Sequence, residues 1–237
     1  PPTPASVGCG EVITRSTLVT NDLAECPGDG LVVGAPRIVL DLGGHRIDGV
    51  GLGSGVLNDG FAEVTVRNGT VQDFDHGVEL LSETAHNVVH GLTVRENELT
   101  AIELFDADAG NAILDNTVEE NGGGIALVSG TAGALVEDNV LTLNSGAALL
   151  VRDATGNQLE DNEVVGGGDL GVGLERAIGN TLLDNEIEGT SDGGTGSFHK
   201  LSVIVPVYDE RNTVAEIVRR MRAVELPVEL EIVIVDD

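Results

Sequence analysis

The segment Asp73-Phe-Asp75-His76-Gly77 brings two carboxylates and an imidazole into one short stretch, and Glu79 follows directly. A carboxylate beside a histidine can carry out general acid–base catalysis, and paired carboxylates can cleave glycosidic bonds. Asp73, Asp75 and His76 are therefore the candidate catalytic residues. A solvated polar turn is the competing interpretation, because Gly77 matches a glycine of the repeat and Asp73 to His76 then occupy the turn before a strand.

The other histidines have weaker claims to a ligand role. His45 shares a sequence column with several asparagines, two residues before an aliphatic position, so we expect an inward turn residue that makes hydrogen bonds. His86 and His90 are four residues apart, a spacing that gives a common face only on a helix. Because these two residues straddle a turn and a strand, the sequence does not favour a metal-binding pair.

Four aspartates recur at a constant spacing of 23 residues: Asp115, Asp138, Asp161 and Asp184. If the repeats stack at strand spacing, neighbouring carboxylates lie about 4.8 Å apart and repel by roughly 0.9 kcal/mol in water. Screening by salt would relieve this repulsion, and so would a cation with oxygen ligands such as Ca²⁺. The column is thus either a salt-adapted surface or a Ca²⁺ site, and no other cofactor is indicated.

The elements that carry these residues form a repeat. Asp-Asn pairs recur every 23 residues, and further asparagine series follow nearly the same step. Aliphatic residues between them alternate as in short strands, and Asn and Gly suit the turns that separate the strands. A three-strand coil of about 23 residues is the unit of a parallel β-helix. We therefore predict an all-β solenoid of six or seven coils over residues 31–190.

The repeat template also predicts which side chains point inward. The coil that starts at Asn111 directs Ile125 and Leu127 inward, and one period later the same positions hold Ala148 and Leu150. Stacked asparagines should form ladders of side-chain amides that satisfy buried turn groups.

The segment Ile38-Val-Leu-Asp-Leu-Gly-Gly-His-Arg-Ile-Asp-Gly49 resembles the opening coil of a known class of solenoid. Residues 30–190 look like the right-handed parallel β-helix repeats of the NosD-like and pectin-lyase-like superfamily, and the resemblance implies the right hand. That superfamily includes polysaccharide lyases, hydrolases, epimerases and non-catalytic proteins, so it does not specify a reaction. Residues 1–197 contain no Trp, Tyr or Lys, which weakens the case for a sugar-modifying enzyme.

Cys9 and Cys26 are the only cysteines, and they bracket a segment, residues 1–30, that we expect to cap the first coil. A disulfide would fasten such a cap and would indicate an oxidising compartment. Two unlinked thiols are the alternative. A zinc site is disfavoured because no histidine lies nearby in the sequence.

Residues 200–237 differ from the rest, since they contain no glycine and follow a Gly/Ser/Thr-rich linker at 191–199. Two apolar strands at 201–207 and 231–235 flank a helix with a capping box at Thr213 and Glu216, which predicts one βαβ unit. The segment is similar to the start of family 2 glycosyltransferases of GT-A fold. This resemblance implies nucleotide-sugar contacts from Pro206, Tyr208, Glu210, Asp236 and Asp237. Asp209 stands where the family has Asn, and the metal-binding Asp-x-Asp is missing, so we expect an incomplete site.

The charge of −28 lies almost wholly in the solenoid, where residues 1–197 contribute −25. So acidic a surface disfavours nucleic acid and anionic membranes as partners, because phosphate binding needs clustered Lys and Arg. The sequence contains no run of 18 apolar residues, so it predicts no membrane-spanning helix. The chain begins at Pro1 without a signal segment, so we expect a mature or truncated product.

Together these patterns predict a secreted, acidic, monomeric β-helix with a structural or ligand-binding role, located outside the cell or at its surface. A polysaccharide or cell-surface glycan is the expected partner. One alternative is a polysaccharide-modifying enzyme that uses Asp73, Asp75 and His76. Another, if the chain is part of a longer protein, is a family 2 glycosyltransferase.

Overall fold

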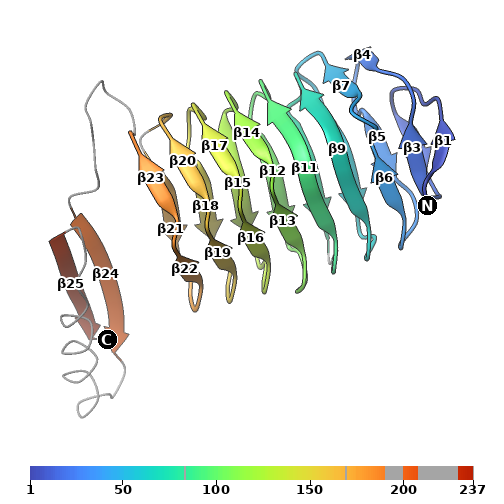
Figure 1. Ribbon diagram of the computed structural model, residues 1–237. Coiled ribbons are helices and arrows are strands. Elements are labelled where there is room, and N and C mark those ends of the chain that lie inside the picture. The colour runs from blue at the N-terminus through green and yellow to red at the C-terminus, as the bar shows by residue number, and fades with distance from the viewer. Residues whose placement is uncertain (83, 169, 190–199, 208–228, 237) are drawn as a thin grey trace. The chain divides into compact units, whose positions relative to one another are not determined.

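The computed structural model describes residues 1–82, 84–168, 170–189, 200–207 and 229–236. The chain divides into two units, Pro1–Gly194 and Thr195–Asp237, and each is described by itself. The first unit is an all-β solenoid in which every strand of one coil pairs in parallel with a strand of the next (Figure 1). The predicted parallel solenoid is therefore confirmed.

Two sheets run along this solenoid. Sheet A has fifteen strands: β1 (Thr3–Ala5), β3 (Thr17–Val19), β4 (Leu23–Cys26), β6 (Val39–Asp41), β7 (Arg46–Gly49), β9 (Thr65–Gln72), β11 (Val88–Arg95), β13 (Ala112–Leu114), β14 (Thr117–Glu119), β16 (Leu135–Glu137), β17 (Val140–Thr142), β19 (Gln158–Glu160), β20 (Glu163–Val165), β22 (Thr181–Leu183) and β23 (Glu186–Glu188). Sheet B has eight: β2 (Glu11–Ile13), β5 (Leu31–Val33), β8 (Ser54–Asp59), β10 (His76–Leu81), β12 (Thr100–Phe105), β15 (Gly123–Val128), β18 (Leu149–Arg152) and β21 (Val172–Glu175).

Each turn of the solenoid contributes one strand to sheet B, so the unit has about eight turns instead of the six or seven predicted. The difference arises before residue 31. There the asparagine repeat is absent, yet short apolar stretches still form strands: β1 pairs with β3, β2 with β5, and β4 with β7. The segment expected to cap the solenoid is thus wound into it. The predicted disulfide between Cys9 and Cys26 is present and joins the loop before β2 to the end of β4.

The core consists of columns of aliphatic side chains that stack from coil to coil. In sheet B, Val78, Ile102 and Ile125 occupy one register column and are buried. The predicted continuation of this column through Ala148 and Leu150 is wrong by one residue: Ile125 pairs with Leu149, and Leu127 with Val151. The cause is one additional residue between Asn144 and the following strand, which shifts that strand while the asparagine spacing stays constant.

The predicted ladders of asparagine amides are confirmed in three columns. Within each ladder, one asparagine donates from Nδ2 to the Oδ1 atom of the asparagine one coil further on, and that Oδ1 also accepts from the backbone N–H of the first asparagine. The ladders are Asn87–Asn111 with Asn157–Asn180, Asn116–Asn139–Asn162–Asn185, and Asn97–Asn121–Asn144. They supply partners for turn groups that would otherwise be buried without one.

In the second unit the structure describes two strands, β24 (Lys200–Val207) and β25 (Glu229–Asp236), which pair in parallel. Both strands predicted for this segment are present. The predicted helix between them falls in residues 208–228, outside the described residues. The described part of the chain includes no helix that is long and apolar enough to cross a membrane.

Candidate functional site

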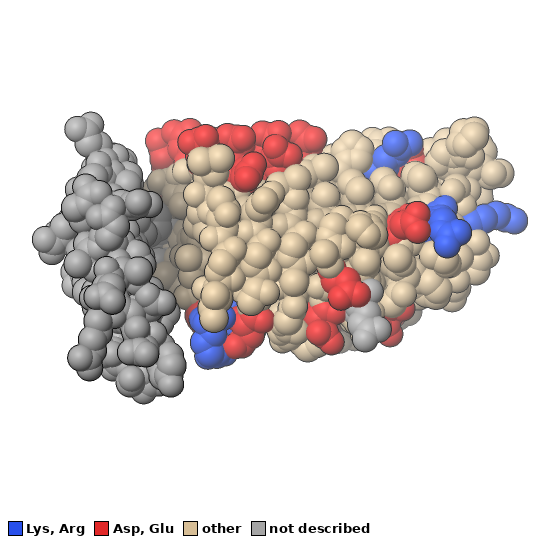
Figure 2. Space-filling view, turned by 90° about the horizontal axis from the view of Figure 1, so that it is seen from below, with Lys and Arg blue, Asp and Glu red and all other residues tan. Residues whose placement is uncertain are grey.

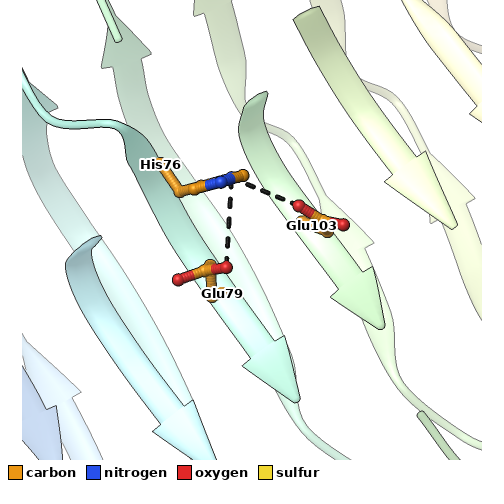
Figure 3. Close-up of side chains that lie close together, drawn as sticks. All are labelled: His76, Glu79 and Glu103. Atoms are coloured by element: carbon orange, nitrogen blue, oxygen red, sulfur yellow. Dashed lines mark ion pairs between the residues drawn. The ribbon is translucent and has the colours of Figure 1, made fainter. Parts of the chain in front are cut away.

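His76, Glu79 and Glu103 lie together on the outer face of sheet B (Figure 3). One ligand atom from each of these residues lies within 4.8 Å of the other two. His76 Nδ1 is 3.2 Å from Glu103 Oε2 and 4.0 Å from Glu79 Oε1. Across the described ranges, no other group of three His, Cys, Asp or Glu residues converges in this way.

The local backbone explains why these side chains point outward. Gly77 faces the interior, because a Cβ atom there would overlap the carbonyl oxygen of Ala101. Val78 is buried as well, so Gly77 and Val78 form an inward stretch. His76 and Glu79 flank this stretch and face outward. Glu79 of β10 and Glu103 of β12 are register partners, so their side chains extend from neighbouring strands on the same face.

The cluster is mostly buried and places two carboxylates beside an imidazole. The side chains of His76, Glu79 and Glu103 are 21%, 16% and 16% exposed. The carboxylate of Glu103 raises the pKa of His76, burial acts in the opposite direction, and the charges of Glu79 and Asp75 add to the rise. The Nδ1 atom is buried and, although close to Glu103, forms no well-directed hydrogen bond. An imidazole nitrogen without a hydrogen-bonding partner thus lies between two carboxylates.

Ser54 and Asp75 surround this cluster from the neighbouring coil and the preceding turn. Ser54, the register partner of His76 on β8, donates its hydroxyl to Glu79 Oε2. The backbone N–H of Gly53 donates to Asp75 Oδ2 at 3.1 Å. One oxygen of Glu79 is therefore held by Ser54, while the other faces His76.

The structure brings Asp75 close to His76 but separates Asp73 from both. Asp73 occupies a corner with a left-handed backbone (φ 58°), and its carboxylate accepts a hydrogen bond from Gln72 in sheet A. The same amide group of Gln72 also donates to Asp48. Burial raises the pKa of Asp48, and the neighbouring Asp73 carboxylate contributes to the rise. The three residues predicted to act together thus do not form one site.

Glu103 was missed by the sequence interpretation. It lies on the next coil, inside an apolar run that looked purely structural. The repeat spacing could have identified it: if Val78 and Ile102 are aligned as equivalent positions of neighbouring coils, Glu79 and Glu103 become partners.

The remaining histidines lie apart from this site. His45 makes a hydrogen bond, as predicted, with Asp22 at 2.9 Å. Its side chain is 34% exposed, however, so the predicted inward orientation is wrong. Leu42 fills the inward space at that corner, where a Cβ on Gly69 would meet it. His86 is at an exposed left-handed corner and His90 is in β11, so they straddle a turn and a strand as predicted.

The aspartate column follows another line of corners. All four residues adopt a left-handed backbone and are exposed: Asp115, Asp138, Asp161 and Asp184. Earlier coils have Asn68 and Gly91 at left-handed corners before the same strand column. Asp, Asn and Gly tolerate this backbone, which gives the column a conformational reason. Figure 2 shows acidic side chains gathered along one edge of the solenoid, where Lys and Arg are sparse.

Two of the residues that the glycosyltransferase resemblance selected are in described strands, Pro206 in β24 and Asp236 in β25. Tyr208, Glu210 and Asp237 lie outside the described residues.

Residues 29–209 of the chain match the family described as the periplasmic copper-binding protein NosD. The match covers more than half of the chain and continues past residue 190 through β24. It does not support the glycosyltransferase resemblance of residues 200–237. No curated protein matches the chain.

Proposed function

The chain belongs to the NosD family, and from this premise we propose that it is a metal-binding β-solenoid that holds a copper ion with His76, Glu79 and Glu103. The single observation that carries the proposal is the convergence of three ligand atoms within 4.8 Å of one another on one face of sheet B. The family description suggests the metal, and the solenoid offers the ligands.

The residues fit a copper ion in both distance and chemistry. Nitrogen and oxygen ligands lie about 2.0–2.2 Å from a transition metal, so two ligands of one ion are at most about 4.4 Å apart. The separations of 3.2 and 4.0 Å from His76 Nδ1 satisfy that limit. Imidazole is a common copper ligand, and two carboxylates would balance the charge of a divalent ion. The copper ion supplies a bound positive charge, and His76 must lose its proton to bind it.

An extracytoplasmic location is part of the same proposal. The Cys9–Cys26 disulfide is characteristic of oxidising compartments, and the family description names a periplasmic protein.

Calorimetric titration of the full chain with Cu(II) sulfate tests the proposal. We expect uptake of about one equivalent, weakened at least about tenfold by His76→Ala and by the isosteric Glu103→Gln. Asp138→Asn, at an exposed corner of the aspartate column, is the matched control and should bind as the native chain does. Equal binding by all four proteins would reject this site, and circular dichroism would verify that each variant is folded.

A polysaccharide-modifying activity is the second candidate, because Asp75 lies close enough to His76 to raise its pKa. It predicts turnover on a panel of acidic and neutral polysaccharides that His76→Ala abolishes. Absence of turnover by the native chain would reject it.

A further inference from the structure

We infer that this site takes copper as Cu(II) and excludes Cu(I), an inference that rests on the proposed copper site. The observation behind it is the kind of donor atom that His76, Glu79 and Glu103 present, together with what the solenoid does not offer nearby.

The three residues offer one imidazole nitrogen and two carboxylate oxygens. Nitrogen and oxygen donors suit Cu(II), whereas Cu(I) is selected by the softer sulfur of thiolates and thioethers. A set without sulfur therefore favours the divalent ion. Three protein donors also leave positions for water at an ion that often takes tetragonal coordination.

No sulfur ligand is available in the solenoid to change that preference. Its two cysteines, Cys9 and Cys26, are joined in a disulfide, and the described residues include no free cysteine. The only methionine of the chain is Met221, in the second unit. Residues 1–194 thus contain neither a thioether nor a free thiol.

Charge leads to the same preference. Two carboxylates that are each 16% exposed can neutralise a divalent ion, whereas a monovalent ion would leave one negative charge in a largely buried site. An unbalanced charge in such a position is costly. The carboxylate of Asp75, the residue before His76, adds to the negative potential and reinforces the preference for the higher charge.

Ser54 keeps the oxygen donors in this arrangement. Its side chain is buried, and its hydroxyl binds Glu79 Oε2, which leaves Oε1 directed to His76. Ser54 is therefore a positioning residue, and Ser54→Ala should weaken Cu(II) binding by roughly 10-fold to 100-fold without removing a ligand.

The test compares the two oxidation states on the full chain. Cu(II) sulfate is titrated in air, and Cu(I) is supplied anaerobically in competition with bathocuproine disulfonate, with the native chain, His76→Ala, Glu103→Gln and the Asp138→Asn control. We expect Cu(II) binding with an electron paramagnetic resonance signal coupled to one nitrogen, and loss of that coupling in His76→Ala. We expect no Cu(I) uptake at this site, so none of these substitutions should change the competition with bathocuproine disulfonate.

The possible outcomes separate the two proposals. Cu(I) binding that His76→Ala and Glu103→Gln both abolish would overturn the preference for Cu(II) while leaving the copper site intact. Failure of both ions to bind would overturn the copper site itself. A Cu(II) signal that is unchanged in His76→Ala would show that the ion is bound elsewhere and would also reject the inference.

Discussion

The side-chain amide of Asn116 donates a 2.9 Å hydrogen bond to the Oδ1 atom of Asn139 on the next coil. The same Oδ1 accepts from the backbone N–H of Asn116 at 3.0 Å, and Asn139 repeats both contacts with Asn162. Each amide is thus acceptor for the coil before it and donor to the coil after it. Removal of one member consequently affects three coils.

Asn139→Ala should lower the free energy of unfolding by about 2–4 kcal/mol. The change leaves two buried donors of Asn116 without an acceptor, and each such group costs about 1–3 kcal/mol. Urea unfolding followed by circular dichroism measures the loss. Asn185→Ala, at the less buried end of the same ladder, is the matched control and should cost less; equal losses would contradict the ladder mechanism.

Leu149→Ala should destabilise the solenoid much more than Leu150→Ala does. Leu149 is fully buried in the column below Ile125, so truncation should cost about 2–5 kcal/mol. Leu150 lies on the outer face and should cost less than about 1 kcal/mol. Thermal unfolding of the two variants decides between the observed register and the one-residue shift that the sequence template predicts.

Replacement of Cys9 and Cys26 by serine should destabilise the first coils by about 3 kcal/mol. The disulfide closes a loop with a sequence separation of 17, and its loss restores chain entropy to the unfolded state. Because a solenoid can lose terminal coils separately, we expect faster hydrogen exchange in strands β1–β5 and little change near β18. A uniform increase along the chain would contradict a local role.

Asp41→Asn should change the dependence of stability on pH. Burial raises the pKa of Asp41, but hydrogen bonds from Gly43 and Asn68 and the Arg67 guanidinium outweigh it, so the pKa is lowered. A lowered pKa stabilises the fold above the unfolded-state value of 3.8, and that stability is lost as pH falls through the folded value. Asp41→Asn should therefore be less stable by roughly 1 kcal/mol near neutral pH, with the gap closing below about pH 4. A constant gap in urea unfolding would reject this origin.

Periodicity made the solenoid and its amide ladders predictable, because stacking at strand spacing requires like residues at a constant step. The regular step also produced the error at Leu150. The turn after Asn144 gains a residue and a later segment loses one, so the asparagine columns keep their spacing while the strand between them shifts. Only the pairing of backbone groups reveals such a compensated shift.

Only part of the candidate site could be predicted from the sequence. His76 and Glu79 belong to one local segment, and acid–base pairs of this kind are found by inspection. Glu103 joins them through the register of β10 and β12, which is a long-range relationship. Asp73 shows the converse, since a residue close in sequence lies at a corner that directs it to the other sheet.

The ladder from Asn116 to Asn185 has a consequence for how the gene can change. From Asn116 to Asn185 each coil repeats the contacts of the one before it after 23 residues. Duplication or deletion of a 23-residue unit in this part would leave asparagines at equivalent positions of neighbouring coils, so the same hydrogen bonds could form. The solenoid would become longer or shorter by one coil. His76, Glu79 and Glu103 all precede it, so such length variation among descendants would leave their geometry unchanged.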